Sequence, residues 1–518
     1  MSSGIHHITL ITRKVQANVD FYAGFLGLRL VKRTAGFEDA MQLHLFYGDA
    51  KASPGSLVTF LVWEDGAPGR LGHGQVGEIS FAIDPASIGY WLTRALSKGI
   101  RMEGPVDEFG EPTLRLKDPD GVIVKLCGVN GMRPAAFWAG GGIPEEHAIG
   151  RIRGATLFTE VPEITEGFVA DHFGYRTIGT AGTIRRMGSD SGDVVDIRDA
   201  SGFWSSAPGT GTADHIAFRA RDRDELQKVH AGLNALNSSV TSAHDRRYFY
   251  SLYVREPGGV LIELATDAPG MSVDEPEASL GTELFVPDNA QLPVDDVKVV
   301  LPQFAMPGEE RVIYRDLPFV HRFFMPENPD DHTLVLLHGS GGSEASLMPL
   351  GHHVMPKSRL LGIRGRSTEE GIARWFRRYE NMTFDQQDIR SEADAFAAFI
   401  EGAITAYHLD AERMTMIGQS NGANFLAAFL LLHPQAVRRA VLLRPMQVLE
   451  DPPRADLSGI GVLVVAGRDD PFSAEAPKLA SLLSAMGAIV ELREIAAGHE
   501  AAAADEVIAR EWLAAQGV

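Results

Sequence analysis

The sequence predicts two architectures in one chain: four repeated α+β units over about residues 1–268, followed by an α/β domain with a mostly parallel sheet. Two observations lead to this prediction. Turn sequences that run into apolar, β-branched strands recur four times in the first half of the chain, each time after a strand and a helix. From about Val312 the pattern changes to fully apolar strands that run into loops of small or charged residues, which is typical of a parallel sheet covered by helices.

The composition indicates a soluble chain of several domains. At roughly 150 residues per domain, 518 residues predict about three domains. The 48 Lys and Arg against 68 Asp and Glu give a net charge of −20, which excludes sequence-independent binding to nucleic acids and argues against binding to anionic membranes. The single cysteine, Cys127, permits no internal disulfide, and no apolar run approaches the ~18 residues of a membrane span. Because no signal peptide is visible, we expect a cytoplasmic protein.

The repeated units are defined by their first and last strands. The first strands are predicted at 5–10, 77–81, 153–157 and 214–218, and the last strands at 53–61, 118–126, 191–197 and 258–264. A helix follows each first strand, most clearly at 19–27 and again at 167–174. These patterns place units one and two at 1–145, units three and four at 146–270, a linker or arm rich in Pro, Asp and Glu at 271–310, and the α/β domain at 311–518.

The repeated unit resembles the βαβββ module of the vicinal oxygen chelate superfamily, which includes glyoxalases, extradiol dioxygenases and bleomycin-resistance proteins. The resemblance implies that the four modules pair into two cupped half-barrels and that metal ligands come from the first and last strands of paired modules. In module order, the first-strand position holds His7, Glu78, Gly154 and His215. The last-strand position holds Phe60, Lys125, Ile197 and Glu263.

These positions predict which modules pair. Modules one and four together offer His7, His215 and Glu263, with apolar Phe60 in the fourth place. Two histidines and a carboxylate form the facial triad of non-haem Fe(II) oxygenases, so we expect Fe(II), with Mn(II) as the alternative, and O₂ as co-substrate. Modules two and three are left without a ligand set, and we expect an ion pair between Glu78 and Lys125 there. His6 precedes the first ligand and is expected on the opposite face of its strand, in a structural role.

Within the superfamily the chain is most similar to hydroquinone-type ring-cleaving dioxygenases. The matching stretches are 4–9 and 246–267, within a resemblance that covers about 4–303. The resemblance implies a small aromatic substrate with two hydroxyl groups. Tyr253, on the strand next to that of Glu263, is the candidate donor or acid/base for a bound phenolate, and Arg246 is the candidate holder of its anionic oxygen. The resemblance favours a para-diol over a catechol. A para-diol cannot chelate through two adjacent oxygens, so Tyr253 and Arg246 are also the candidates that hold its second hydroxyl.

Two other functions stay open for the repeated part. One is a glyoxalase-like, metal-dependent lyase or isomerase that uses Zn or Ni, but such enzymes tend to have four protein ligands, and Phe60 argues against a fourth. The other is a quinone- or drug-binding cup of the bleomycin-resistance kind, which would not need His7, His215 and Glu263 together. Oxygen uptake with hydroquinones separates all three.

The last part of the chain carries a second set of catalytic residues. The apolar strand 414–417 leads into Gly418-Gln419-Ser420-Asn421-Gly422 and the apolar helix 423–432, which is the nucleophile elbow. Asp470 and His499 follow later strands in the order of the α/β-hydrolase layout, with Asp469 as the alternative acid. Ser420 is then the nucleophile, His499 the base and Asp470 the group that orients it.

The backbone N–H groups of Asn421 and Ser340 are the expected oxyanion hole of this site. Residues 312–518 resemble the small serine carboxylesterase/phospholipase family, which implies hydrolysis of small esters. The whole chain is thus predicted to be a bifunctional fusion of a dioxygenase and a serine hydrolase. The hydrolase could cleave the ring-fission product or an ester precursor, and homo-oligomerisation is left open.

Overall fold

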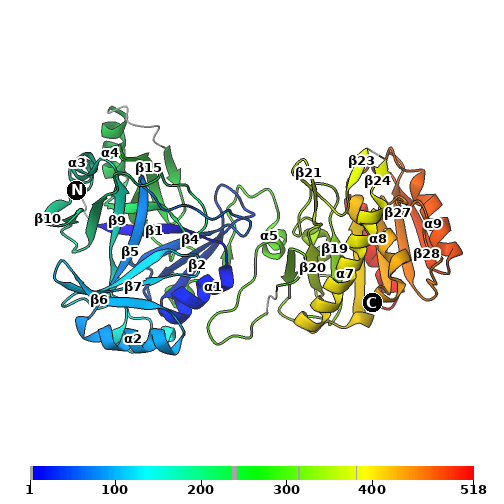
Figure 1. Cartoon of the computed structure of the whole chain (residues 1–518), viewed down its shortest axis with the longest axis horizontal. Helices are drawn as coiled ribbons and strands as arrows, with labels where there is room; N and C mark the ends of the chain where they lie inside the picture. The colour runs from blue at the N-terminus through cyan, green and yellow to red at the C-terminus, as the bar shows by residue number, and fades with distance from the viewer. Residues whose placement is uncertain (1–3, 236–241, 313–315, 381) are drawn as a thin grey trace. The chain divides into compact units, whose positions relative to one another are not determined.

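The computed structural model describes residues 4–235, 242–312, 316–380 and 382–518 (Figure 1). It divides into two compact units. The N-terminal unit comprises Met1–Gln291 and Phe304–Glu310, and the C-terminal unit comprises Leu292–Gln303 and Arg311–Val518. Residues 271–310, predicted to be a linker or an arm, thus contribute to both units.

The N-terminal unit consists of two curled sheets. The nine-stranded sheet has the order β14-β15-β16-β13-β1-β4-β3-β2-β17 and therefore joins modules one and four. Its strands are β1 (Ile5–Thr12), β2 (Arg29–Ala35), β3 (Leu43–Gly48), β4 (Leu57–Val62), β13 (Ala213–Ala220), β14 (Ser242–Asp245), β15 (Phe249–Arg255), β16 (Leu261–Pro269) and β17 (Leu284–Phe285). β1 and β13 meet antiparallel at the seam between the two modules.

The eight-stranded sheet has the order β10-β11-β12-β9-β5-β8-β7-β6 and joins modules three and two. Its strands are β5 (Gln75–Ile83), β6 (Met102–Glu108), β7 (Glu111–Lys117), β8 (Ile123–Gly128), β9 (Arg151–Thr159), β10 (Arg176–Ala181), β11 (Ile184–Gly188) and β12 (Val194–Asp199). The module helices are α1 (Val15–Val19), which continues as a π-helix (Asp20–Phe25), α2 (Ile88–Ser97), α3 (Pro162–Phe173) and α4 (Arg223–Ala235). The four βαβββ modules and their predicted pairing are confirmed.

The strand register corrects two of the predicted last-strand positions. Glu263 pairs with the residue two after His215, and the same rule holds for Lys125 and Glu78 in module two. In module one this rule selects Thr59, which pairs with Thr9, and not Phe60. A slip of one residue turns a side chain to the other face of a sheet. Phe60 is accordingly buried on the helix side against Tyr22, with ring centroids 4.4 Å apart.

In module three the same rule replaces Ile197 by Asp196, which pairs with Thr156.

The prediction for His6 also needs correction. The register of β1 against β13 shifts between Ile5 and His7, which marks an irregularity of the bulge type. As a result His6 does not lie on the opposite face: its Nδ1 is 2.9 Å from Nδ1 of His7.

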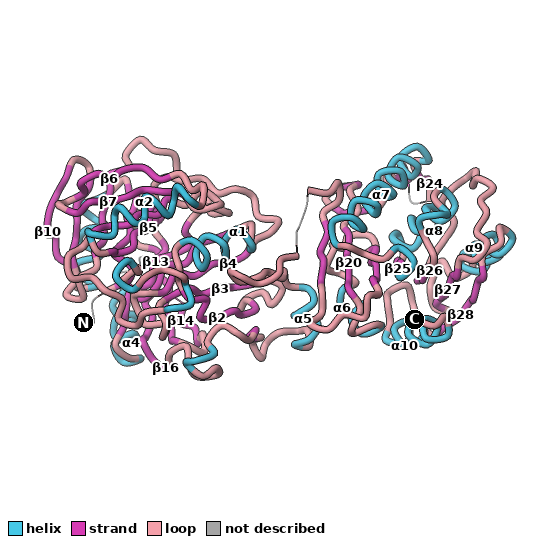
Figure 2. Tube along the Cα trace, turned by 90° about the horizontal axis from the view of Figure 1, so that it is seen from below, coloured by secondary structure: helices cyan, strands magenta, loops and turns pink. Residues whose placement is uncertain are grey.

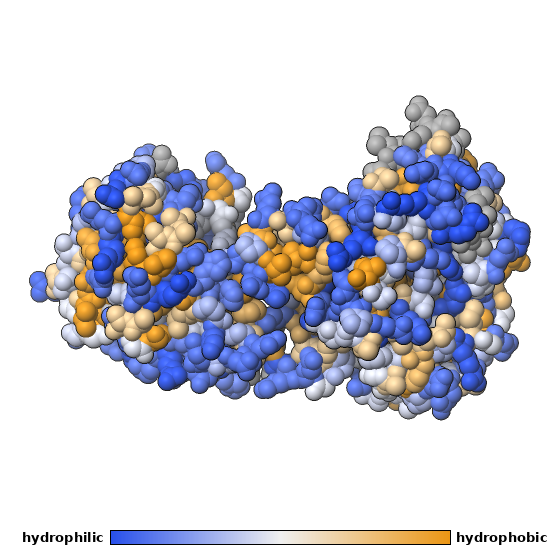
Figure 3. Space-filling model, turned by 180° about the vertical axis from the view of Figure 1, so that it is seen from behind, coloured by the Kyte–Doolittle hydropathy of each residue, from blue (hydrophilic) through white to orange (hydrophobic). Residues whose placement is uncertain are grey.

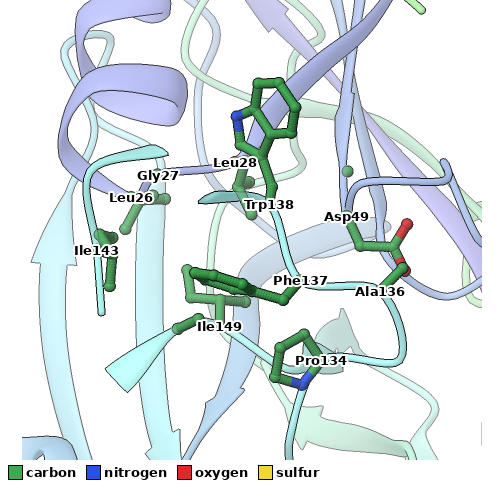
Figure 4. A pocket seen from close by; sticks show the side chains of 12 residues that line it. Leu26, Gly27, Leu28, Asp49, Pro134, Ala136, Phe137, Trp138, Ile143 and Ile149 are labelled. Carbon is green, nitrogen blue, oxygen red and sulfur yellow. The ribbon is translucent and has the colours of Figure 1, made fainter. Parts of the chain in front are cut away.

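Two irregular segments brace the nine-stranded sheet. After β16 the chain folds back so that β17 pairs parallel with β2. The ammonium group of Lys32, on β2, is wholly buried between Asp274, at 2.6 Å, and Glu275. The segment between modules two and three packs its apolar side chains against module one, where Trp138 and Ile143 enclose a small cavity with Leu26 (Figure 4).

The C-terminal unit has a seven-stranded sheet of order β18-β20-β19-β25-β26-β27-β28, in which all neighbours except β18 and β20 are parallel. The strands are β18 (His321–Phe324), β19 (Thr333–Leu337), β20 (Arg359–Ile363), β25 (Met414–Gln419), β26 (Arg439–Leu443), β27 (Gly461–Gly467) and β28 (Ile489–Ile495). Two short hairpins are formed by β21 (Ser367–Glu369) with β22 (Ile372–Arg374) and by β23 (Arg378–Glu380) with β24 (Thr383–Phe384). The α/β-hydrolase topology predicted from the strand ends is confirmed.

Helices cover both faces of this sheet, as Figure 2 shows. One hydrophobic core joins the sheet to helices α7 (Gln386–Tyr407), α8 (Asn421–Leu432) and α9 (Glu475–Ala485). The other joins it to helices α5 (Val294–Val300), α6 (Met348–Val354) and α10 (Ala503–Ala515). No helix within the described ranges combines the length and the apolar character needed to cross a membrane. On the face seen in Figure 3, hydrophilic side chains predominate and hydrophobic ones gather in several smaller patches.

Candidate active sites

The structure brings the three predicted metal ligands together. His7 on β1, His215 on β13 and Glu263 on β16 are buried, and one ligand atom of each lies within 4.8 Å of the other two. The Oε2 atom of Glu263 is 3.0 Å from Nε2 of His7 and 2.8 Å from Nε2 of His215. Sheet order explains this convergence, because β1, β13 and β16 are consecutive neighbours in the nine-stranded sheet.

Neighbouring side chains orient both imidazoles. Nδ1 of His215 is 2.7 Å from a carboxylate oxygen of Asp214, and Nδ1 of His7 is 2.9 Å from Nδ1 of His6. Each histidine therefore turns its Nε2 toward the cluster. A carboxylate on the far nitrogen is the usual support of a metal-binding histidine, because it fixes the tautomer and the ring orientation. No sequence pattern assigns this supporting role to Asp214 or His6, although both adjoin a predicted ligand.

The cluster fits a divalent cation. Neither oxygen of the Glu263 carboxylate has a hydrogen-bond donor in favourable geometry among the described residues, although the side chain is wholly buried. Burial alone would raise the pKa of Glu263, but the facing His7 and His215 hold it well below its usual value. A bound cation would replace the two histidines' protons as the positive partner of this buried carboxylate. Two imidazoles and one carboxylate are a donor set that suits Fe(II).

A cavity of about 390 Å³ opens beside the cluster. Aromatic side chains form much of its wall, including those of Phe37, Phe46 and Phe249. Apolar, aromatic walls with a few polar groups are typical of sites for small molecules. The cavity is therefore suited to a small planar ring that lies against His7 and His215, two of the three predicted ligands.

The two further residues predicted from the resemblance line the same cavity. Tyr253 is the direct strand partner of Glu263, and its ring lies edge-on to that of His215 with centroids 5.2 Å apart. The guanidinium of Arg246 lies 5.8 Å from the Tyr253 ring centroid and is 2.9 Å from Oε1 of Glu38, whose side chain is 74% exposed. Burial raises the pKa of Tyr253 well above its usual value, and Glu263 adds to this effect. The phenol therefore remains protonated and can donate a hydrogen bond.

The corresponding position of the other cup is filled by ion pairs. The Glu78 carboxylate is 3.0 Å from Nζ of Lys125, as the sequence predicts, and 2.7 Å from Nη1 of Arg115. Asp196 accepts two hydrogen bonds from the Arg186 guanidinium, at 2.8 and 2.9 Å. Both carboxylates at these positions are therefore neutralised by protein cations.

The C-terminal unit aligns the predicted catalytic triad. Ser420 Oγ is 2.7 Å from Nε2 of His499, and Nδ1 of His499 is 3.0 Å from Oδ2 of Asp470. Asp470, and not Asp469, therefore makes the contact with the imidazole. The order of contacts is that of nucleophile, base and orienting acid.

The nucleophile stands on a strained turn between β25 and α8. The φ angle of Ser420 is +51°, a conformation that is unfavourable for residues other than glycine. A Cβ atom at Gly418 would lie 2.7 Å from the backbone nitrogen of Ala423, so a side chain there would clash. This geometry agrees with the elbow predicted from the motif and turns Oγ toward His499.

The two expected donors of the oxyanion hole are held by one segment. Asn421 is the first residue of α8, where backbone N–H groups have no acceptor within the helix. Its side-chain Oδ1 accepts a hydrogen bond from the backbone N–H of Trp375 at 2.9 Å. Oγ of Ser340 accepts one from the guanidinium of Arg374 at 2.7 Å. The neighbouring residues Arg374 and Trp375 thus hold the side chains of both expected oxyanion-hole residues, Ser340 and Asn421.

A wholly buried ion pair anchors the loop that carries His499. Arg444 donates two hydrogen bonds to the Asp505 carboxylate, at 2.8 and 3.0 Å. The same guanidinium donates to the carbonyl oxygens of Gly498, at 2.8 Å, and Glu500, at 3.2 Å. These carbonyls flank the catalytic histidine, so the pair determines where its backbone lies. No local motif connects Arg444 with Asp505, so this pair is not predictable from the sequence.

Replacing Asp505 by alanine is expected to lower the free energy of unfolding of the C-terminal unit by about 3–5 kcal/mol, because the Arg444 guanidinium would stay buried without its carboxylate. Urea titration of the full chain, followed by residual ester hydrolysis, measures the change. Replacing Glu412, whose side chain is 67% exposed in its pair with Arg438, is the control and is expected to leave the urea midpoint unchanged. An equally unchanged midpoint for the Asp505 variant would contradict the anchoring role.

Known proteins resemble this chain in both parts. A family model described as "Glyoxalase/Bleomycin resistance protein/Dioxygenase superfamily" matches residues 4–126. The "Putative ring-cleaving dioxygenase MhqO" of Bacillus subtilis (strain 168) is 35% identical over 286 residues, which cover 55% of this chain and 91% of that protein. The "Chlorohydroquinone/hydroquinone 1,2-dioxygenase" of Sphingobium indicum is 28% identical over 292 residues, which cover 55% of this chain and 91% of that protein.

The "Putative hydrolase MhqD" of Bacillus subtilis (strain 168) is 33% identical over 184 residues, which cover 35% of this chain and 92% of that protein. Among solved structures, a "putative dioxygenase from Bacillus subtilis subsp. subtilis str. 168" has a TM-score of 0.56 and 32% identity, and the match covers 59% of this chain and 98% of the other. Proteins named as dioxygenases and a protein named as a hydrolase are thus each matched over most of their length by one part of this chain.

Proposed function

Because the chain belongs to the glyoxalase/bleomycin resistance protein/dioxygenase superfamily and is related to ring-cleaving dioxygenases, we propose that its N-terminal unit is an Fe(II)-dependent dioxygenase that cleaves hydroquinones. The observation that carries this proposal is the cluster of His7, His215 and Glu263 beside an aromatic-walled cavity. Fe(II) is the metal proposed, and Mn(II) is the alternative for the same ligands.

The proposed reaction consumes one O₂ for each ring. A carbon–carbon bond next to a hydroxyl-bearing carbon breaks. One oxygen atom ends in a carboxylic acid and the other in an aldehyde, so no external reductant is needed. His7, His215 and Glu263 would hold the metal, which would bring phenolate and O₂ together and allow electron transfer between them.

The protein residues bind and orient the ring. The aromatic wall holds the ring by its faces, excludes water and directs the phenolate oxygen toward the side of His7 and His215. Tyr253 lies beside Glu263 and donates a hydrogen bond to the developing oxyanion. Arg246 provides positive charge on the same side of the cavity, where it attracts the anionic form of the substrate.

Replacing Tyr253 by phenylalanine is expected to lower kcat for a hydroquinone by about 10²–10³-fold, because one donor to the developing oxyanion is lost. Bound metal should be unchanged, since the ring of Tyr253 and all three ligands remain. Oxygen consumption and metal analysis of the same preparation measure both quantities. A variant that loses metal and activity in proportion would show that Tyr253 supports the ligands and takes no part in the reaction.

For the C-terminal unit we propose a serine hydrolase that acts on small acyl compounds. His499 accepts the proton of Ser420 as Oγ attacks the carbonyl carbon, and it returns that proton to the leaving group. Water then enters by the same proton path and releases the acid. The two substrate candidates are the ring-fission product and an ester precursor of the aromatic substrate. Whichever of them is the substrate should remain uncleaved in the presence of a Ser420→Ala variant.

A further inference from the structure

The cavity contains a polar side chain whose function is not explained by metal binding. His44 lies on β3, and its imidazole lines the cavity together with His7 and His215. Its Nε2 is 3.0 Å from Oγ1 of Thr59. No other residue within the described ranges forms a hydrogen bond with the second ring nitrogen, Nδ1, which is therefore available to a ligand.

A chain of hydrogen bonds links His44 to the strand of the metal ligands. Oγ1 of Thr59 is 2.9 Å from Oγ1 of Thr9, and both hydroxyls are buried. Thr9 lies two residues after His7 and pairs across the sheet with His215. Thr59 occupies the place that a fourth metal ligand would take, but its hydroxyl is held by Thr9 and His44. Thr59, at the position of a fourth ligand, therefore holds the His44 imidazole and not the metal.

The placement of His44 suits a ligand with two polar ends. β3 is separated from β1 by β4 alone. Two strand spacings are about 10 Å between backbones, which leaves space for one ring between the side chains of a curled sheet. Burial lowers the pKa of His44 to about 3, with the facing His7 adding to the effect. The imidazole is therefore neutral, and Nδ1 can donate or accept according to the direction of the threonine chain.

Two other polar residues of the cavity, Gln42 and His244, are less suited to this task. His244 is 32% exposed and faces the carboxylate of Glu38 at 3.8 Å. Gln42 follows the exposed turn that precedes β3.

We infer that His44 determines substrate specificity by binding the second hydroxyl group of a para-dihydroxylated ring whose first oxygen faces His7, His215 and Glu263. This inference rests on the proposed dioxygenase and names the residue that recognises the second hydroxyl of its substrate. A para-diol cannot chelate one metal through both oxygens, so its distant hydroxyl needs a protein partner. A buried polar group that is left unpaired by an analogue without that hydroxyl would reject the analogue.

The test compares hydroquinone with 4-methylphenol, a ring of similar size whose para substituent cannot form a hydrogen bond. The measured quantity is the ratio between the inhibition constant of 4-methylphenol and the KM of hydroquinone. We expect His44→Phe to lower this ratio at least about tenfold, mainly through a higher KM, as for the loss of one buried hydrogen bond. His44→Gln, which retains a polar side chain, should recover part of the ratio.

Thr59→Val tests the hydrogen-bond chain and should shift the ratio in the same direction by a smaller factor, because the imidazole remains but its tautomer is no longer fixed. Metal content and ester hydrolysis establish that each variant is folded. An unchanged ratio in both His44 variants, with active wild-type protein, would overturn the inference alone. Absence of oxygen uptake by the iron-loaded wild type would overturn the proposed dioxygenase and this inference with it.

Discussion

Replacement of Ser420 by alanine is expected to lower ester hydrolysis by about 10⁴–10⁶-fold, since removal of the nucleophile leaves only binding and the oxyanion hole. The expectation rests on the 2.7 Å contact with His499, which no other described hydroxyl makes. Initial rates with p-nitrophenyl esters of short acids measure the effect. Oxygen consumption by the same preparation should be unchanged, because the two sites lie in separate compact units.

The matched control is Ser484→Ala, which removes an exposed hydroxyl from α9 of the same unit. Its rate of ester hydrolysis should equal that of the wild type. Turnover by the Ser420 variant within about tenfold of the wild-type rate would show that hydrolysis does not use this nucleophile, whatever the geometry of the triad.

Replacement of Glu263 by glutamine is expected to weaken iron binding by at least about 100-fold. Loss of a residue that only orients a metal ligand already lowers metal affinity by about 10–100-fold, and Glu263 is itself a proposed ligand. The amide keeps the shape of the side chain but supplies no negative charge between the two imidazoles. Iron should be measured by elemental analysis after purification without oxygen. Oxygen uptake should fall with the metal, and ester hydrolysis should remain.

Glu78→Gln is the matched control for this variant. Glu78 is also a buried carboxylate on a strand of the N-terminal unit, but its partners are Lys125 and Arg115. The control should retain the wild-type iron content. If instead the Glu263 variant retains full iron, these three side chains are not the ligand set.

The sequence predicts which modules pair because the residues at the ligand positions differ from module to module. Only modules one and four combine two histidines with a carboxylate, and that combination is the one that the sheet order joins. The hydrolase triad was predictable for a different reason. Its nucleophile lies in a local motif between an apolar strand and an apolar helix, and the acid and base follow strand ends in a fixed chain order.

The errors arose where one residue of register decides the outcome. The turn before β4, Ser53-Pro54-Gly55, does not align residue for residue with the turn before β8. The sequence therefore points to Phe60, whereas the strand register selects Thr59. A slip by one residue exchanges the two faces of a strand. His6 was misplaced because a bulge in β1 suspends the alternation of faces, and residue identities alone do not reveal a bulge.

Other features could not be predicted because they depend on contacts between distant segments. His44 acquires its position through Thr59, on a neighbouring strand, and no motif connects the two. Arg444 and Asp505 likewise meet only after β26 and α10 have packed on the sheet. Such buried polar groups follow from the complete fold, since each needs its partner to offset the loss of water.

The central claim is that the N-terminal unit cleaves a dihydroxylated ring with O₂. The most direct measurement is oxygen consumption by iron-loaded protein with substituted hydroquinones and catechols in parallel, together with the mass of each product. We predict uptake with hydroquinones and a ring-opened product heavier than its substrate by one O₂. Uptake with catechols alone would contradict the para-diol preference, and no uptake with either class, despite a full iron site, would contradict the dioxygenase itself.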